Sequence, residues 1–167
     1  MPAVLQLSND KTWRIRISVV SFFPKLARLL DRETFSQKVE QQLVNMMMDP
    51  VFAVREEAAK SVIELSKSPY DRAWLDALIT QKVDEFSRSQ TFMIRIHAIH
   101  LMNMMRPHIS TSIISQKFGP VFIKLASDPV PNIRFNVSKS IKTFWANFGR
   151  AAQMDLETTL KKQANDD

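Results

Sequence analysis

The sequence contains no cysteine and only two glycines among its 167 residues. Without cysteine, disulfides and thiolate metal sites are excluded, and a reducing compartment is the natural setting. Two glycines are too few for an all-β fold built on many tight turns, so their scarcity favours helices. No apolar run is long enough to cross a bilayer, and the chain does not open on a basic-then-apolar signal segment. We therefore expect a soluble cytoplasmic protein, with the nucleus as a second compartment and no membrane partner.

The net charge is +6, but only the first segment is clearly basic. Residues 1–38 carry seven basic and three acidic side chains, whereas the two signs interleave along the rest of the chain. A nucleic-acid-binding protein usually concentrates its basic residues on one face or along one helix. The distribution favours a solvated mixed surface over a nucleic-acid partner.

Four arginines recur at intervals of 39, 40 and 39 residues: Arg16, Arg55, Arg95 and Arg134. Six residues before each of them stand Asp10, Asp49, Ser89 and Asp128. Apolar residues follow each arginine with the spacing of one helix face. The pattern predicts that a helix begins near each arginine and that Val62, Met102 and Ile141 are buried.

A first helix should end just before each aspartate, because Pro50 and Pro129 directly follow two of them and cannot continue a helix. We expect first helices at about residues 34–48 and 71–87. Second helices are expected at about 14–30, 54–66, 93–105 and 132–147. Pro24 lies inside the first of these and is expected to kink it.

A helix, a short turn and a helix with a period near 40 residues is the signature of the HEAT repeat. The sequence thus predicts an all-α fold, a HEAT-repeat α-solenoid of stacked antiparallel helix pairs that forms a single domain over residues 1–167. The predicted repeats are 1–32, 33–70, 71–109 and 110–149, with a partial fifth repeat at 150–167. Both terminal repeats look incomplete, so we expect exposed apolar edges there.

Four stretches carry a more specific resemblance: residues 8–16 (SNDKTWRIR), 23–27 (FPKLA), 54–59 (VREEAA) and 128–140 (DPVPNIRFNVSKS). In this order they resemble the C-terminal third of the HEAT-repeat scaffold (A) subunits of protein phosphatase 2A, over about residues 3–145. The HEAT regulatory subunits of protein phosphatase 4 are similar in the same stretches.

The resemblance implies a non-catalytic subunit that binds a serine/threonine protein phosphatase catalytic subunit through its intra-repeat turns. A regulatory subunit would be a partner only if further repeats exist in a longer chain. The residues carried over to the catalytic-subunit contact are Trp13, Arg14, Phe52, Phe92, Met93, Pro131 and Asn132.

The residue types point to the same surface without the resemblance. Trp13, Phe52 and Phe92 are expected in turns, where the helical pattern requires no large aromatic. Aromatic and arginine side chains are enriched at binding hot spots. The alternative is that these rings pack back over the repeat junctions. An alternative function is a HEAT adaptor that binds nucleic acid or an acidic protein through the basic first repeat.

The sequence does not predict an enzyme or a cofactor. No glycine-rich phosphate loop occurs, and nothing places serine, histidine and aspartate in a triad. His97 and His100 have a helical spacing that can seat a metal, but no third ligand stands nearby, so we expect solvent-facing histidines and no metal. The repeated charges are interpreted as a structural ladder that bonds neighbouring backbone or an adjacent repeat: Asp10, Arg16, Asp49, Arg55, Arg95, Asp128 and Arg134.

Overall fold

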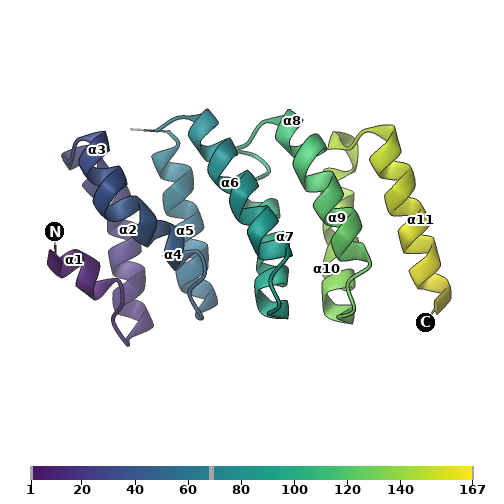
Figure 1. The fold of residues 1–167 in the computed structure, drawn as a ribbon, viewed down its shortest axis with the longest axis horizontal. Helices are drawn as coiled ribbons and strands as arrows, with labels where there is room; N and C mark the ends of the chain where they lie inside the picture. Colours follow the sequence, from purple (N-terminus) through teal and green to yellow (C-terminus); the bar gives the residue numbers. More distant parts are fainter. Residues whose placement is uncertain (1, 68–69, 167) are drawn as a thin grey trace. The chain divides into compact units, whose positions relative to one another are not determined.

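The computed structural model describes residues 2–67 and 70–166, and all regular secondary structure in these ranges is helical. The chain divides into two compact units, Met1–Leu75 and Asp76–Asp167. Figure 1 shows antiparallel helix pairs in each unit. The all-α helical-repeat prediction is therefore confirmed. None of the helices described here combines the length and apolar character that a bilayer span requires.

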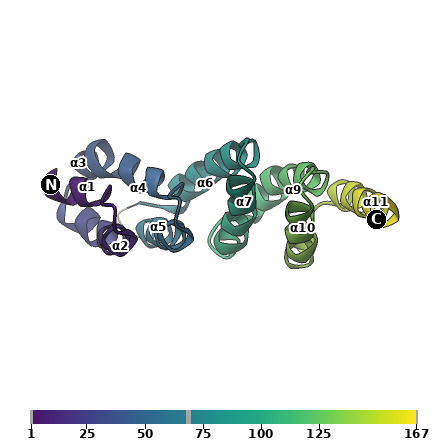
Figure 2. The same ribbon diagram turned by 90° about the horizontal axis from the view of Figure 1, so that it is seen from below.

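In unit 1, the helices lie in two layers, one made by the first helix of each repeat and the other by the second helix. Figure 2 shows α3 and α4 in one layer and α2 and α5 in the other, and α2 packs along α5. The elements are α1 (Pro2–Leu7), α2 (Trp13–Leu29), α3 (Arg32–Phe35), the π-helical turn η1 (Ser36–Glu40), α4 (Gln41–Met46) and α5 (Phe52–Leu65).

In unit 2, helix α9 lies at the centre and contacts both α10 and α11, while α10 also contacts α7. Helix α6 begins within unit 1 and continues into unit 2. The elements are α6 (Arg72–Ser87), α7 (Phe92–Met105), α8 (Thr111–Ile113), the π-helical turn η2 (Ile114–Phe118), α9 (Gly119–Ala126), α10 (Pro131–Phe144), the 3₁₀ turn η3 (Trp145–Asn147) and α11 (Arg150–Asp166).

Each recurring arginine is the fourth residue of a second helix, because α2, α5, α7 and α10 all begin three residues before it. The predicted starts were therefore one or two residues too late. The residue before each helix has an extended backbone, at Thr12, Val51, Thr91 and Val130. The π-helical turns also recur, since Ser36 and Ile114 are 78 residues apart, two repeat lengths.

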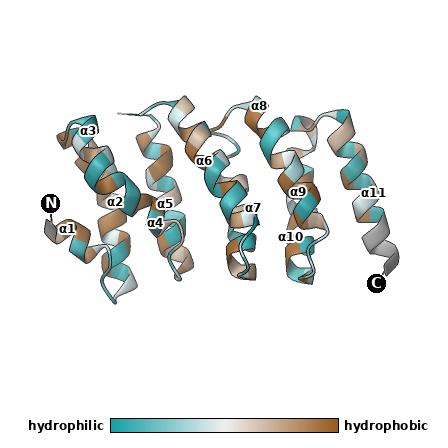
Figure 3. Ribbon diagram, viewed as in Figure 1, coloured by the Kyte–Doolittle hydropathy of each residue, from teal (hydrophilic) through white to brown (hydrophobic). Residues whose placement is uncertain are grey.

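The apolar residues that follow each arginine form the core. Val62 and Met102 are fully buried, and Ile141 is buried as well, as the spacing predicted. Figure 3 shows apolar and polar residues alternating along the helices, as expected of helices buried on one face.

His97 does not face solvent, contrary to the prediction, and His100 is half-buried. His97 is 2% exposed on α7, and its ring centroid lies 5.5 Å from that of Phe86 on α6. The helical spacing predicted that only one face of α7 is buried. His97 lies outside that face, and it is buried because α6 packs against it through Phe86. Among the described residues, no group of three or more His, Cys, Asp or Glu side chains is arranged to hold a metal ion.

Pro24 lies within α2, and the helix continues through it. Proline has no backbone N–H, so the carbonyl of Val20, four residues earlier, loses its helical partner. The Ser61 hydroxyl of α5 donates to the Val20 carbonyl oxygen instead, at 2.9 Å in a buried position. A side chain of the second repeat thus completes the helix of the first.

Replacing Ser61 with alanine should destabilise unit 1 by about 1–3 kcal/mol, because it leaves a buried carbonyl without a donor. Ser66→Ala is a matched control, since Ser66 Oγ bonds the carbonyl of Ile63 three residues earlier in the chain. Chemical denaturation of both variants measures the difference. Equal, small losses would contradict the proposed role of Ser61.

Candidate protein-binding surface

The turn between the helices of a repeat is closed by the recurring acidic residue. The carboxylates of Asp10, Asp49 and Asp128 each accept the backbone N–H two residues ahead, at 2.7, 2.8 and 2.9 Å. Ser89 closes its turn through its hydroxyl oxygen, at 3.2 Å. Such local side-chain bonds compete with helix formation, so they terminate one helix and set the start of the next.

The recurring arginine clamps the same turn from the other side. Nη1 of each arginine donates to the backbone carbonyl six residues earlier, at 2.6–3.0 Å. The four bonds are Arg16 to Asp10, Arg55 to Asp49, Arg95 to Ser89 and Arg134 to Asp128. The turns are therefore held at two points, and the residues on them have fixed positions.

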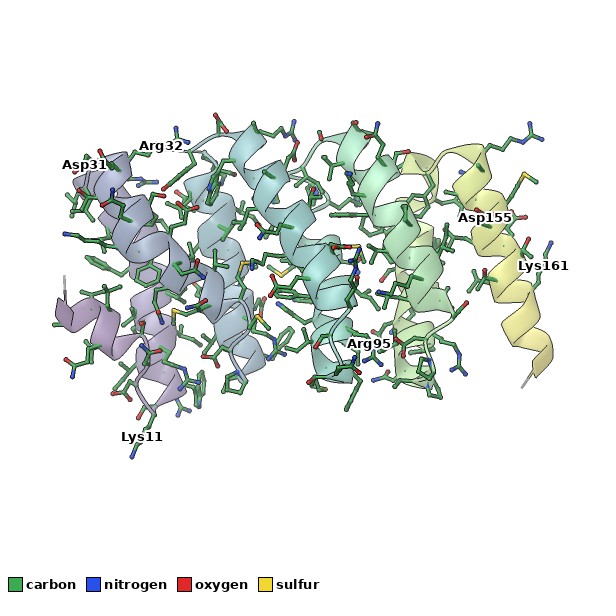
Figure 4. The ribbon with its side chains drawn as sticks, in the orientation of Figure 1. Lys11, Asp31, Arg32, Arg95, Asp155 and Lys161 are labelled. Atoms are coloured by element: carbon green, nitrogen blue, oxygen red, sulfur yellow. The ribbon has the colours of Figure 1, made fainter. Side chains whose placement is uncertain are left out.

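Within each unit, one arginine also bridges two repeats. Arg16 donates through Nε and Nη2 to both carboxylate oxygens of Asp49, at 2.7 and 2.8 Å. Arg95 does the same to Asp128, at 2.7 and 3.0 Å, and Figure 4 places it near the start of α7, beside the start of α10. Bidentate pairs of this kind are stronger than neutral hydrogen bonds and fix geometry.

These pairs set the protonation of their members. The hydrogen bonds to Asp49 and Asp128 raise the pKa of Arg16 and Arg95. Burial alone would raise the pKa of the Asp128 carboxyl, but hydrogen bonds from Arg95 and the Val130 N–H outweigh it, so this pKa is lowered. In the pair of Arg95 and Asp128, the folded chain therefore favours the charged form of both partners.

Arg55 has a different environment from the other recurring arginines. It is 5% exposed, and burial lowers its pKa. Its guanidinium lies 5.6 Å from the centre of the ring of Phe52, the first residue of α5. In the repeat that follows Arg55, Ser89 stands where an aspartate recurs in the other turns. That position therefore offers no carboxylate of the kind that receives Arg16 and Arg95.

Aromatic side chains in unit 1 stand at the starts of the second helices. Phe52 is 47% exposed, and Trp13 is half-buried beneath the Arg14 guanidinium, which lies 4.5 Å from its ring centre. Both residues were expected in turns, but each is the first residue of its helix. The predicted helix start was one residue late at Trp13 and two residues late at Phe52, because the extended residue before each helix, and not the aromatic, ends the turn.

The second helices of unit 2 also begin with exposed residues. Phe92 and Met93 open α7 and are 44% and 48% exposed. Pro131 and Asn132 open α10 and are exposed. Phe92, like the aromatics of unit 1, is therefore helical and does not lie in the turn.

Sequence reasoning missed Phe135, which is 60% exposed on α10 with the Lys139 ammonium 5.1 Å from its ring centre. A signal was present in the sequence. Ile133 and Val137 are four residues apart on the buried face, so the residue midway between them points to the opposite side of the helix.

The likeness of this chain to known proteins lies in its fold. No protein-family model matches the chain, and no curated protein matches it. The crystal structure of Cex1p, a HEAT-like helical protein, superposes with a TM-score of 0.61 at 13% sequence identity. The match covers 98% of this chain and 29% of that one, so the chain spans less than a third of its structural neighbour. The likeness supports the helical-repeat fold.

Proposed function

We propose that the chain is a non-catalytic scaffold that binds the catalytic subunit of a serine/threonine protein phosphatase through the starts of its second helices. The observation that supports this best is the exposure of Phe52, Phe92 and Met93, each beside a turn held at two points. Large apolar side chains on a rigid support lose little conformational freedom on binding, which favours affinity.

The alternative, binding of nucleic acid through the basic first repeat, has weaker support. Arg28 pairs with Glu64 at 2.6 Å, and Lys60 pairs with Glu56 at 3.2 Å. These cations line a hollow between α2 and α5 together with a third cation, Lys25, and with Glu57 and Glu64. A groove that tracks phosphates needs an excess of unpaired positive charge, and here acidic side chains offset it.

Replacing Phe52 with alanine should weaken binding to a purified phosphatase catalytic subunit by more than ~2 kcal/mol, about 30-fold in Kd. Trp13→Ala should act in the same direction. Arg16→Ala should act mainly on stability, because it breaks the pair with Asp49. Titration calorimetry and thermal melting of each variant separate the two effects.

Leu29→Ala is the matched control, since Leu29 is a 77% exposed apolar residue at the far end of α2. It should leave the affinity unchanged. If Leu29→Ala and Phe52→Ala weaken binding equally, the starts of the second helices are not the contact surface. A Kd that rises steeply with salt concentration and is the same for Phe52→Ala, Leu29→Ala and the unsubstituted chain would favour the nucleic-acid alternative.

A further inference from the structure

An open apolar hollow of about 350 Å³ lies over α1 and α2 in unit 1. Its apolar lining comes from Val4 and Leu7 of α1 and from Ile15, Val19 and Phe22 of α2, and Arg14 and Ser18 stand at the same hollow. Leu7, Ile15 and Phe22 are 44%, 37% and 40% exposed. Large apolar side chains gathered around one hollow indicate a surface that another element covers.

The equivalent face is covered on α5 and on α10, where the same unit supplies a preceding repeat. One repeat after Ile15, Val19 and Phe22, the corresponding residues of α5 are Val54, Ala58 and Ser61. All three are buried, and Ser61 bonds α2 directly. The corresponding residues of α10 are also buried, and its Ser140 accepts a hydrogen bond from Asn103 of α7 at 2.8 Å.

Asp10 is the polar part of the same surface. Asp49 and Asp128 each close their own turn and also receive the arginine of the preceding repeat. Asp10 closes its turn in the same way, through the Thr12 N–H at 2.7 Å. Among the side chains that the structure describes, no arginine forms an ion pair with the Asp10 carboxylate.

We infer that this face binds a further HEAT-type helix pair, whose second helix carries an arginine at its fourth position. That arginine would donate to both oxygens of Asp10, as Arg16 does to Asp49. The partner helix needs a small side chain opposite Phe22, because phenylalanine replaces the serine found at Ser61 and Ser140. The partner is thus specified by charge, by apolar character and by shape.

A second copy of this chain fits the surface less well. By the 39-residue period, α1 corresponds to the part of α11 that begins near residue 158. In unit 2 that position is already filled by α11, which packs against α9. If the C-terminal end of a second copy packed on this face, α11 of that copy would occupy the position of α1 of the first, and the two helices would overlap.

The probe for the test is an extra copy of residues 111–148 joined to the N-terminus of the full chain by a flexible Gly/Ser linker. This segment carries Arg134 at the fourth position of α10 and the small residue Ser138 one turn later. Tethering keeps the probe at a high effective concentration. In the tandem, amide exchange of Val19 and Phe22 should slow by about tenfold or more relative to the chain alone.

Asp10→Asn in the tandem should reverse most of this protection, as should Arg134→Met in the extra copy. Asp155→Asn, at an exposed acid on α11 (Figure 4), should not. Unchanged exchange in the tandem would overturn the inference. Protection that survives Asp10→Asn would overturn the arginine contact. Concentration-dependent dimers of the chain alone, dissociated by Asp10→Arg, would show that a second copy is the occupant and overturn the proposed one.

Discussion

Phe144→Ala should destabilise unit 2 by about 3–5 kcal/mol, the range for truncating a large buried aromatic. Phe144 is fully buried, and its ring centroid lies 5.0 Å from Phe122 and 6.1 Å from both Phe118 and Phe148. Alanine would leave a cavity among three rings carried by η2, α9 and the loop after η3, which cannot all close in on it. Chemical denaturation measures the loss.

Phe135→Ala is the matched control on the same helix, because the Phe135 ring is exposed. It should change the free energy of unfolding by less than about 0.5 kcal/mol. Since contacts between helical repeats are mainly nearest-neighbour, hydrogen exchange in the Phe144 variant should accelerate most in α9, α10 and α11. Uniform acceleration across residues 2–67 as well would contradict this local picture.

Arg95→Ala should cost about 3 kcal/mol, because it removes two bonds to Asp128 and two to backbone carbonyls and leaves a carboxylate that is only 6% exposed. Lys139→Ala, which removes a cation from the exposed side of α10, is the control. Denaturation of the two variants compares their free energies of unfolding. If Arg95→Ala and Lys139→Ala lower the free energy of unfolding equally, the bidentate pair does not contribute to stability.

The same pair predicts a response to acid. The pKa of Asp128 is lower in the folded chain than its ordinary value, so its contribution is complete above about pH 4 and is lost as the pH falls through the folded pKa. Asp128→Asn should therefore reduce the acid-induced loss of stability, measured by denaturation at about pH 7 and about pH 3. An unchanged pH dependence would contradict the assignment.

The sequence was sufficient to predict the repeat, because the spacing of Arg16, Arg55, Arg95 and Arg134 reflects a helix start that recurs in the structure. It could not predict how the rest of each helix is covered. The burial of His97 depends on α6, and the division into two units depends on contacts that no periodicity encodes.

The sequence pattern also predicted only those residues of the candidate surface that recur from repeat to repeat. Phe52 and Phe92 are aromatic residues near recurring helix starts, so the pattern located them, whereas Met93 was named through the family resemblance alone. Phe135 has no aromatic counterpart in the two preceding repeats, since Ile96 and Glu56 occupy that position. A search for recurring features therefore passed over it.

The bond from Ser61 to the Val20 carbonyl links the residue that position 24 can hold to the residue at position 61. Proline at position 24 without that donor would leave a buried carbonyl unbonded, at the cost of about 1–3 kcal/mol expected for Ser61→Ala. Serine without the proline is harmless, as Ser140 shows by bonding the Asn136 carbonyl of its own helix. The two positions are therefore coupled, because Ser61 supplies a donor that is needed only where Pro24 withholds one.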